Sequence, residues 1–220
     1  MVENGLTREM LAERCAREFQ HNWIVNLGVG MPTLCSDYVI EGRRVIFHAE
    51  NGVIGYGKGA RGEEIDPYVT NAGGQPVTLK SYASFINHAE SFGIVRSGRL
   101  DCAVLGAYEV AVNGDFANWK LPGNIGGGIG GAMDIAACAK RLLLMMDHNV
   151  KGKPRLLEQC TLPVTAPGVV KLVVTTLGVF EPTGKAFLMK EIAPGYTTDE
   201  VISLTGAPVV IDPNLTVMEF

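Results

Sequence analysis

Short hydrophobic segments recur along the chain and alternate with segments of helical pattern. Residues 45–47 (VIF) and 142–146 (LLLMM) contain no polar side chain, which is typical of strands covered on both faces. The hydrophobic spacing predicts three further strands, in residues 23–30, 100–110 and 186–192. Residues 167–182 fit either a helix or a strand, because their valines and threonines oppose the helical spacing.

Helices are predicted between these strands from capping residues and from the spacing of apolar positions. Thr7 can cap a helix that runs to about Phe19, with its apolar residues four positions apart. Pro32 suits the first turn of a second helix, which would run to about Val39. Further helices are predicted in residues 130–141 and 197–206, the latter with Thr197 and Glu200 at capping-box spacing and Gly206 at its end.

This alternation predicts an α/β fold: an open, mainly parallel sheet with helices on both faces. No linker, charge block or change of composition divides the chain, so we expect one domain over residues 1–220. In such folds, ligands bind at the carboxyl ends of the strands. Gly28, Glu50, Gly106 and Asp147 all lie at or just after predicted strand ends and are therefore candidates for a common site.

Composition narrows the function classes. The net charge of -4 provides no basic face for nucleic acid. The longest purely apolar stretch, residues 142–146, is far too short to span a membrane, and the N-terminus has no signal-peptide layout. The five cysteines are odd in number and scattered, which favours reduced thiols. We therefore expect a cytoplasmic protein without nucleic-acid or membrane partners.

Metal and hydrolase chemistry have little support in the residue spacing. The histidines form no H-x-x-x-H pair and no close pairing with cysteine, so no metal site is expected. Cys102 and His148 could form a thiol–imidazole pair, but Cys102 lies within an apolar strand and is better interpreted as a buried structural cysteine. No G-x-S-x-G motif is present for a serine hydrolase.

Two glycine-rich turns are candidate ligand sites. Gly28 and Gly30 follow a strand and precede a helix, as in dinucleotide-binding turns, but Thr33 occupies the place of the third glycine. The turn could instead hold another ligand or be purely structural. Residues 123–131 contain six glycines before a helix. They predict either a mobile surface loop or backbone N–H donors for a phosphate or a developing oxyanion.

Glu50, in the segment HAENGVIGYG, is the remaining candidate for chemistry. A single acid before Asn-Gly can be an ordinary turn carboxylate. It can also be a nucleophile, because a glutamate side chain is ionised at pH 7 without any activation. A nucleophilic carboxylate needs donors for the oxyanion that forms when it attacks a carbonyl, and the glycine turns could supply them.

Six segments together carry a resemblance that extends over residues 7–210. They read, in order, VNLGVGMPT, ENGVIGYG, NAGGQPVTL, LGAYEVAVNGDFANW, GGGIGGAMD and CTLPVT. In the order and wording of these six segments, the chain resembles the B (β) subunits of family I coenzyme A-transferases, most of all those acting on 3-oxoacids and 3-oxoadipate. The resemblance implies an open α/β fold, an A (α) subunit partner in a hetero-oligomer and an active site between the subunits.

The resemblance also implies the chemistry. Glu50 matches the glutamate that forms a covalent thioester with coenzyme A during a ping-pong transfer. Acyl-CoA would be both substrate and source of this intermediate, with no permanently bound cofactor and no metal. The expected binding residues are Gly28 and Gly30, Asn51 and Gly52 in the turn, Asn118 as a contact to a carbonyl, and Gly128, Gly130 and Gly131 as backbone donors.

The chain departs from the family pattern around the nucleophile, at Ala49, Tyr56 and Lys58. The acid pair therefore stays open: succinate with acetoacetate or 3-oxoadipate, or acetate with a short fatty acid such as butyrate. Three other classes also remain: an acyl-CoA hydrolase on the same scaffold, a dinucleotide-binding oxidoreductase and a non-catalytic partner subunit. The number of subunit pairs is not determined by the sequence.

Overall fold

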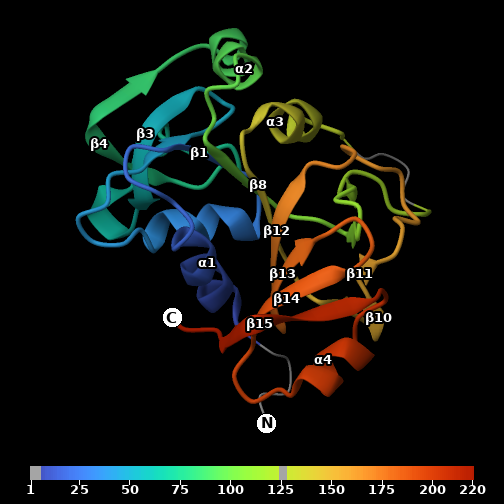
Figure 1. The fold of residues 1–220 in the computed structure, drawn as a ribbon. Helices are drawn as coiled ribbons and strands as arrows, with labels where there is room; N and C mark the ends of the chain where they lie inside the picture. The colour runs from blue at the N-terminus through green and yellow to red at the C-terminus, as the bar shows by residue number, and fades with distance from the viewer. Residues whose placement is uncertain (1–5, 124–127) are drawn as a thin grey trace.

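A ten-stranded sheet runs through the protein (Figure 1), of which the computed structural model describes residues 6–123 and 128–220. Its five central strands, in the order β2-β1-β5-β8-β12, are parallel to one another. These strands are β1 (Ile24–Leu27), β2 (Ile46–His48), β5 (Cys102–Leu105), β8 (Leu142–Met146) and β12 (Val170–Thr175). The predicted open, mainly parallel α/β sheet is confirmed.

The flanking strands are mostly antiparallel. On one side β3 (Val53–Gly59) and β4 (Val77–Phe85) extend the sheet as a meander from β2. On the other side β13 (Gly178–Pro182) and β14 (Phe187–Ile192) pair antiparallel, and β15 (Val209–Val217) pairs parallel with β14. The edge strands β4 and β15 leave the sheet open.

Helices cover both faces, and the central strand β8 shows how. All five of its residues are buried. Leu143 and Met145 pack into one core with α1 (Arg8–Ala16) and the 3-10 helix η1 (Met31–Asp37). Leu142, Leu144 and Met146 pack into the other core. That second core also receives α2 (His88–Arg96), α3 (Ala132–Cys138) and α4 (Thr198–Ser203).

Small elements complete the second core and the surface. A three-stranded sheet, ordered β11-β6-β7, contributes Val110, Phe116 and Leu156 to that core. Its strands are β6 (Glu109–Ala111), β7 (Phe116–Ala117) and β11 (Leu156–Leu157). Just before β11, the strands β9 (Asn149–Val150) and β10 (Lys153–Pro154) form a separate hairpin. A short 3-10 helix, η2 (Gly62–Glu64), follows β3.

The predicted helix caps are confirmed, with shorter helices than expected. Thr7 accepts a hydrogen bond from the Met10 N–H at 3.3 Å, but α1 ends at Ala16 rather than at Phe19. Thr197 and Glu200 form a capping box at the start of α4. The α4 helix ends at Ser203, so Gly206 lies beyond it.

The second helix is 3-10 rather than α, and ends before Val39. Pro32 lies in its first turn, as predicted. The Thr33 hydroxyl donates to the Gly30 carbonyl at 2.7 Å, and the Ser36 hydroxyl donates to the Thr33 carbonyl at 3.0 Å. These side-chain bonds to carbonyls three residues back match the tighter winding of a 3-10 helix.

One strand prediction is wrong, and one open segment is settled. Residues 100–110 are not one strand: β5 ends at Leu105, and β6 begins at Glu109 in the small sheet. Residues 167–182, which fitted either structure, form the antiparallel pair β12 and β13. The strand β4 was not predicted. Most of its residues are exposed, so its sequence contains no continuous hydrophobic run.

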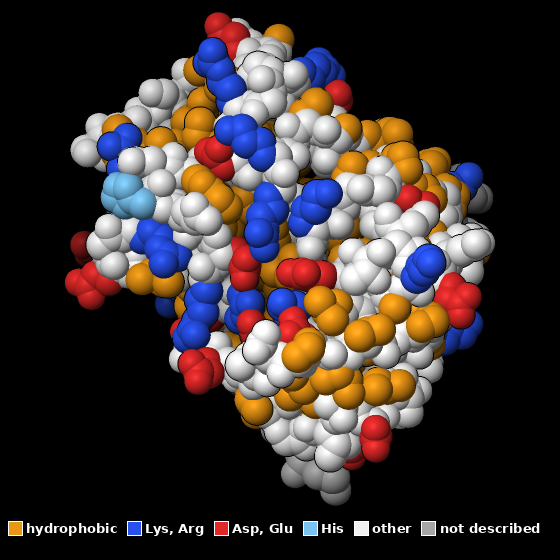
Figure 2. Space-filling model, viewed as in Figure 1, with side chains coloured by type: hydrophobic (Ala, Val, Ile, Leu, Met, Phe, Trp, Pro, Cys, Tyr) orange, Lys and Arg blue, Asp and Glu red, His pale blue; other side chains and the backbone are white. Residues whose placement is uncertain are grey.

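The surface combines charged and apolar areas. On the face in Figure 2, charged side chains of both signs gather around α1, and hydrophobic side chains gather over the strands toward β15. Val210, Ile211 and Val217 of this edge strand are exposed. Within residues 6–123 and 128–220, no helix is long and apolar enough to cross a membrane.

Candidate active site

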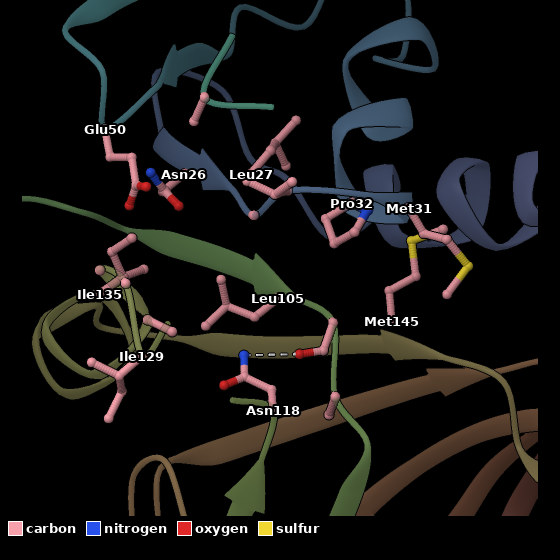
Figure 3. Close-up of a pocket in the computed structure, with 18 of the residues that line it drawn as sticks. Asn26, Leu27, Met31, Pro32, Glu50, Leu105, Asn118, Ile129, Ile135 and Met145 are labelled. Carbon is pink, nitrogen blue, oxygen red and sulfur yellow. Dashed lines mark hydrogen bonds between the residues drawn. The ribbon is translucent and has the colours of Figure 1, made fainter. Parts of the chain in front are cut away.

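The carboxyl ends of the central parallel strands meet at one edge of the sheet and border a cavity of about 410 Å³ (Figure 3). Gly28 directly follows β1, Gly106 directly follows β5, and Glu50 stands two residues after β2. All three line the cavity, whereas Asp147, which follows β8, does not. Three of the four strand-end candidates therefore share one site.

The other predicted residues divide between the cavity and its surroundings. Asn118, Gly128, Gly130 and Gly131 also line the cavity. Gly30, Asn51 and Gly52 do not. Gly126 and Gly127 lie outside the described residues. The apolar wall includes Leu27, Met31, Pro32, Leu105, Ile129, Ile135 and Met145 (Figure 3).

A tight turn presents Glu50. The Gly52 N–H donates to the Ala49 carbonyl at 2.9 Å, which closes the turn over residues 49–52. Gly52 has a φ of +111°, and a Cβ there would collide with the Ile86 carbonyl, so glycine is required on both counts. The Asn51 side chain donates to the Thr70 carbonyl at 2.9 Å. Asn51 and Gly52 therefore shape the turn rather than the cavity.

The Glu50 side chain projects into the cavity and rests against the start of α3 (Figure 3). A Cβ added at Gly131 would collide with the Glu50 carboxylate and with the Phe92 ring. The missing side chain at Gly131 is thus what lets the carboxylate approach this backbone. Within the described part of the chain, the carboxylate takes no hydrogen bond and no ion pair, so it is available to a ligand.

A buried polar chain lies behind the nucleophile candidate. The Asn26 side-chain amide donates to His48 Nδ1 at 3.0 Å and to the His48 carbonyl at 3.1 Å. Because Nδ1 accepts, the ring proton is on Nε2, which donates to the Ser91 hydroxyl at 3.0 Å. Ser91 in turn donates to the Ala49 carbonyl at 3.4 Å. Burial lowers the pKa of His48, in keeping with a neutral ring.

This chain leaves one buried polar atom without a partner among the described residues. Both amide hydrogens of Asn26 are used on His48, and its buried Oδ1 has no partner among the described residues. Asn26 lines the cavity (Figure 3). The sequence held a signal for this residue, since Asn26 interrupts the apolar run of β1.

Asn118 reaches the cavity from the small sheet. Its side-chain amide donates to the Gly106 carbonyl at 3.1 Å (Figure 3), and its Oδ1 accepts from the Thr165 hydroxyl at 2.8 Å. One amide hydrogen therefore remains for a ligand carbonyl. These bonds hold the loop after β5 to the strand β7 and shape the cavity floor.

The departures from the family pattern around Glu50 do not form the cavity wall. Ala49 and Tyr56 are buried in the core, where the Tyr56 ring packs on Phe47 at 5.3 Å between centroids. Lys58 is exposed in β3, and its ammonium lies 3.8 Å from the Glu64 carboxylate. None of the three lines the cavity. They differ from the family pattern without changing the surface that meets a ligand.

Other candidate chemistry is located elsewhere. Cys102 is buried in β5 among apolar side chains. His148 contacts the hydroxyl groups of Thr175 and Thr205, both at 3.0 Å, rather than Cys102. Burial raises the pKa of Cys102 and lowers that of His148 to about 4. Among the described residues, no three histidine, cysteine or acidic side chains gather where they could hold a metal ion.

One charged residue of the cavity had no signal in the sequence. Arg155, between β10 and β11, lines the cavity beside Ala107 and Tyr108. It lies 105 positions from Glu50 and belongs to no recognisable motif. Only the crossing from β8 through the small hairpin brings it to this edge.

Comparison with known proteins supports one family. The coenzyme A transferase family model matches residues 8–204. The chain is 43% identical over 206 residues to the β subunit of a probable coenzyme A transferase of Bacillus subtilis, covering 93% of this chain and 95% of that protein. It is 42% identical over 213 residues to the B subunit of the 3-oxoadipate CoA-transferase of Pseudomonas putida, covering 95% and 99%. Identity to the B subunit of the succinyl-CoA:3-ketoacid coenzyme A transferase of Helicobacter pylori is 39% over 201 residues, covering 91% and 97%.

Solved structures agree in fold. An acyl-CoA transferase of Escherichia coli O157:H7 superposes with a TM-score of 0.74 at 21% identity, over 97% of this chain and 43% of that longer one. The decarboxylase AibA/AibB superposes with a TM-score of 0.75 at 19% identity, over 97% and 88%. The fold thus carries more than one reaction, and the sequence match decides between them. The chain belongs to the coenzyme A transferase family.

Proposed function

We propose that the protein is the catalytic B subunit of a CoA-transferase that exchanges CoA between two carboxylic acids through a glutamyl-CoA thioester on Glu50. The observation that carries this proposal is the Glu50 carboxylate, which has no hydrogen-bond or ion-pair partner among the described residues and is held by a tight turn in a cavity at the carboxyl edge of the sheet. A carboxylate engaged in a structural ion pair would not be free to attack.

The reaction starts when a Glu50 carboxylate oxygen attacks the thioester carbonyl of a donor acyl-CoA. The carbon–sulfur bond breaks, giving a mixed anhydride and CoA thiolate. The thiolate then attacks the Glu50 carbonyl, and the donor acid leaves as its carboxylate. The acceptor acid runs the same steps in reverse and leaves as its CoA ester. Each step conserves one negative charge, and none consumes water.

The residues around Glu50 fit roles in these steps. Gly131 lets the carboxylate lie against the start of α3, where backbone N–H groups of Gly128, Gly130 and Gly131 are candidates for oxyanion stabilisation. Asn118 has a free amide hydrogen for an acyl or pantetheine carbonyl. The apolar wall excludes water, which preserves the energy of the thioester. No permanently bound cofactor is needed.

The partner in this proposal is an A subunit that covers the open side of the cavity. The relatives from Pseudomonas putida and Helicobacter pylori are named as B subunits. Val29, which lines the cavity, is 61% exposed, and Met133, which follows the cavity residue Ala132 in α3, is 43% exposed. Exposed apolar side chains at the mouth of a site suit a subunit interface. The assembly acts in the cytoplasm.

The substrates in this proposal are succinyl-CoA and a 3-oxo acid, acetoacetate or 3-oxoadipate. The names of two relatives support this pair, one acting on succinyl-CoA and a 3-ketoacid and the other on 3-oxoadipate. The competing pair is acetate and a short fatty acid. Turnover of the assembled protein with each acceptor acid separates the two.

Trapping the intermediate tests the reaction. Acyl-CoA is added without an acceptor, and the Glu50 peptide is analysed by mass spectrometry with and without borohydride, which reduces a thioester but not a carboxylate. We expect a CoA adduct on Glu50. E50Q should form none and lose nearly all transfer, while E50D, with its carboxylate displaced by about one ångström, should lose ~10²-fold.

The control is E63Q, which removes an exposed acid that lies outside the cavity. It should leave adduct formation and transfer unchanged. Near-normal turnover of E50Q would return Glu50 to the role of a turn residue. Release of free CoA without any acceptor acid would instead make the protein a hydrolase.

A further inference from the structure

The cavity holds two opposite charges. Among the described residues that line it, Glu50 is the only acid and Arg155 the only base. The proposed reaction accounts for Glu50 alone. The presence of a cation in an otherwise neutral, largely apolar cavity therefore needs its own explanation.

Arg155 is held rigidly at its backbone and loosely at its side chain. Its N–H donates to the His148 carbonyl at 3.0 Å, and its carbonyl accepts from the Val110 N–H at 2.9 Å. The guanidinium makes one hydrogen bond, to the Ala107 carbonyl at 3.3 Å. An arginine has five N–H donors, so most of them lack a partner in the described structure.

The electrostatic setting favours an anionic ligand. Burial lowers the pKa of Arg155, and the Asp147 carboxylate opposes this effect without forming an ion pair with it. Four other arginines, Arg14, Arg61, Arg96 and Arg141, each contact a carboxylate. A half-buried guanidinium without such a pair gains most from an anion that enters the cavity.

The spacing suits a short acyl chain. Glu50 follows β2, and Ala107 follows β5, with β1 between them. His48 of β2 and Ala103 of β5 pair with the same residue of β1, so these two strands lie two strand spacings, about 10 Å, apart. Glu50 and Arg155 both line the cavity beyond these strand ends, and a separation of this order suits an acyl group of a few carbon atoms.

We propose that Arg155 binds the distal carboxylate of a dicarboxylic acyl group while Glu50 attacks the thioester carbonyl at its other end. This assignment rests on the proposed function and names its substrate class: CoA esters of short dicarboxylic acids, such as succinyl-CoA. The planar guanidinium can hold a carboxylate through two parallel hydrogen bonds. It also offsets the repulsion between that carboxylate and the anionic Glu50.

The same guanidinium could meet a second anion, a phosphate of coenzyme A. The two sources differ in their dependence on the acyl group. A phosphate contact affects every acyl-CoA equally, whereas a contact to the distal carboxylate affects only dicarboxylic esters. Succinyl-CoA and butyryl-CoA separate the two, because they share chain length and differ by a carboxylate in place of a methyl group.

The experiment uses the chain assembled with its A subunit and measures two quantities for each ester: the rate of CoA loading onto Glu50 and kcat/KM. R155M removes the charge at similar size, and R155K keeps the charge without the paired donors. K153M is the matched control, since it removes a positive charge two residues away on an exposed side chain outside the cavity.

We expect R155M to lower kcat/KM for succinyl-CoA by ~10–100-fold, as for the loss of a charged hydrogen bond. Loading from butyryl-CoA should stay near the wild-type rate, R155K should recover part of the loss, and K153M should resemble the wild type. Equal losses for both esters would overturn the assignment in favour of a phosphate contact. Unchanged kinetics would overturn it as well, because Arg155 would then only hydrogen-bond the Ala107 carbonyl and would not bind the substrate. Failure of wild-type protein to load CoA from either ester would instead refute the proposed function itself.

Discussion

Replacing Gly131 with alanine tests the placement of the proposed nucleophile. The added methyl group would overlap the Glu50 carboxylate, which would have to move by about 1 Å to reach an ordinary van der Waals separation. Gly131 has a φ of −84°, so alanine causes no backbone strain there. The perturbation therefore acts on the geometry between Glu50 and the start of α3 and on the neighbouring Phe92 ring.

The expected magnitude follows from this displacement. A misplacement of about 1 Å in a reacting group can cost ~10²-fold in rate, equivalent to about 2.7 kcal/mol of activation free energy. We expect G131A, assembled with its A subunit, to lose ~10²-fold in kcat. Its rate of CoA loading onto Glu50 should fall in parallel, while the melting temperature and subunit association stay close to those of the wild type.

G128A provides the matched control. Gly128 lines the same cavity, but a Cβ there would meet no atom closer than 4.0 Å. This variant should retain most of its activity. Turnover of G131A within a few-fold of the wild type would refute the reasoning, because the collision would then leave the chemistry intact. Equal losses in G128A and G131A would show that the loop tolerates no side chain for reasons unrelated to Glu50.

Three further predictions concern stability and assembly. Burial lowers the pKa of His148 to about 4 in the folded protein, against an ordinary value of 6.5. The neutral ring therefore contributes fully to the free energy of unfolding above pH 6.5, and about 3 kcal/mol of that free energy is lost as the pH falls toward 4. Urea unfolding at the two ends of this range should show a smaller loss in H148Q. G52A should lower the free energy of unfolding by ~1–3 kcal/mol, because the φ of +111° at Gly52 and the nearby Ile86 carbonyl both oppose a side chain. An unchanged midpoint of urea unfolding would contradict this prediction. The chain alone should self-associate in size-exclusion chromatography and show no transfer until its A subunit is added.

Local sequence determined much of the framework. The apolar runs at residues 45–47 and 142–146 predicted buried strands, because a strand that is covered on both faces has apolar side chains on both. The caps at Thr7 and Thr197 marked helix starts, because they satisfy N–H groups of the first turn. The edge strand β4 escaped notice because its exposed residues carry no such pattern.

For the candidate site, the sequence predicted Glu50 and several glycines, of which Gly28, Gly128, Gly130 and Gly131 line the same cavity as Glu50. Ordered motifs along the chain pointed to the coenzyme A transferase family, and the comparisons confirm it. The strand-end rule placed Gly28, Glu50 and Gly106 at one edge, because parallel strands bring their carboxyl ends together. It also suggested Asp147, which follows a strand but does not line the cavity.

What surrounds Glu50 was decided by tertiary structure. The hydrogen-bonded chain of Asn26, His48 and Ser91 joins β1, β2 and α2, and no sequence spacing encodes that meeting. Arg155 reaches the same cavity from a short hairpin more than a hundred residues after Glu50. Local patterns determine where strands and helices form, because they depend on neighbours in the chain. The composition of a cavity depends on which strand ends the sheet order brings together, and only the folded chain establishes that order.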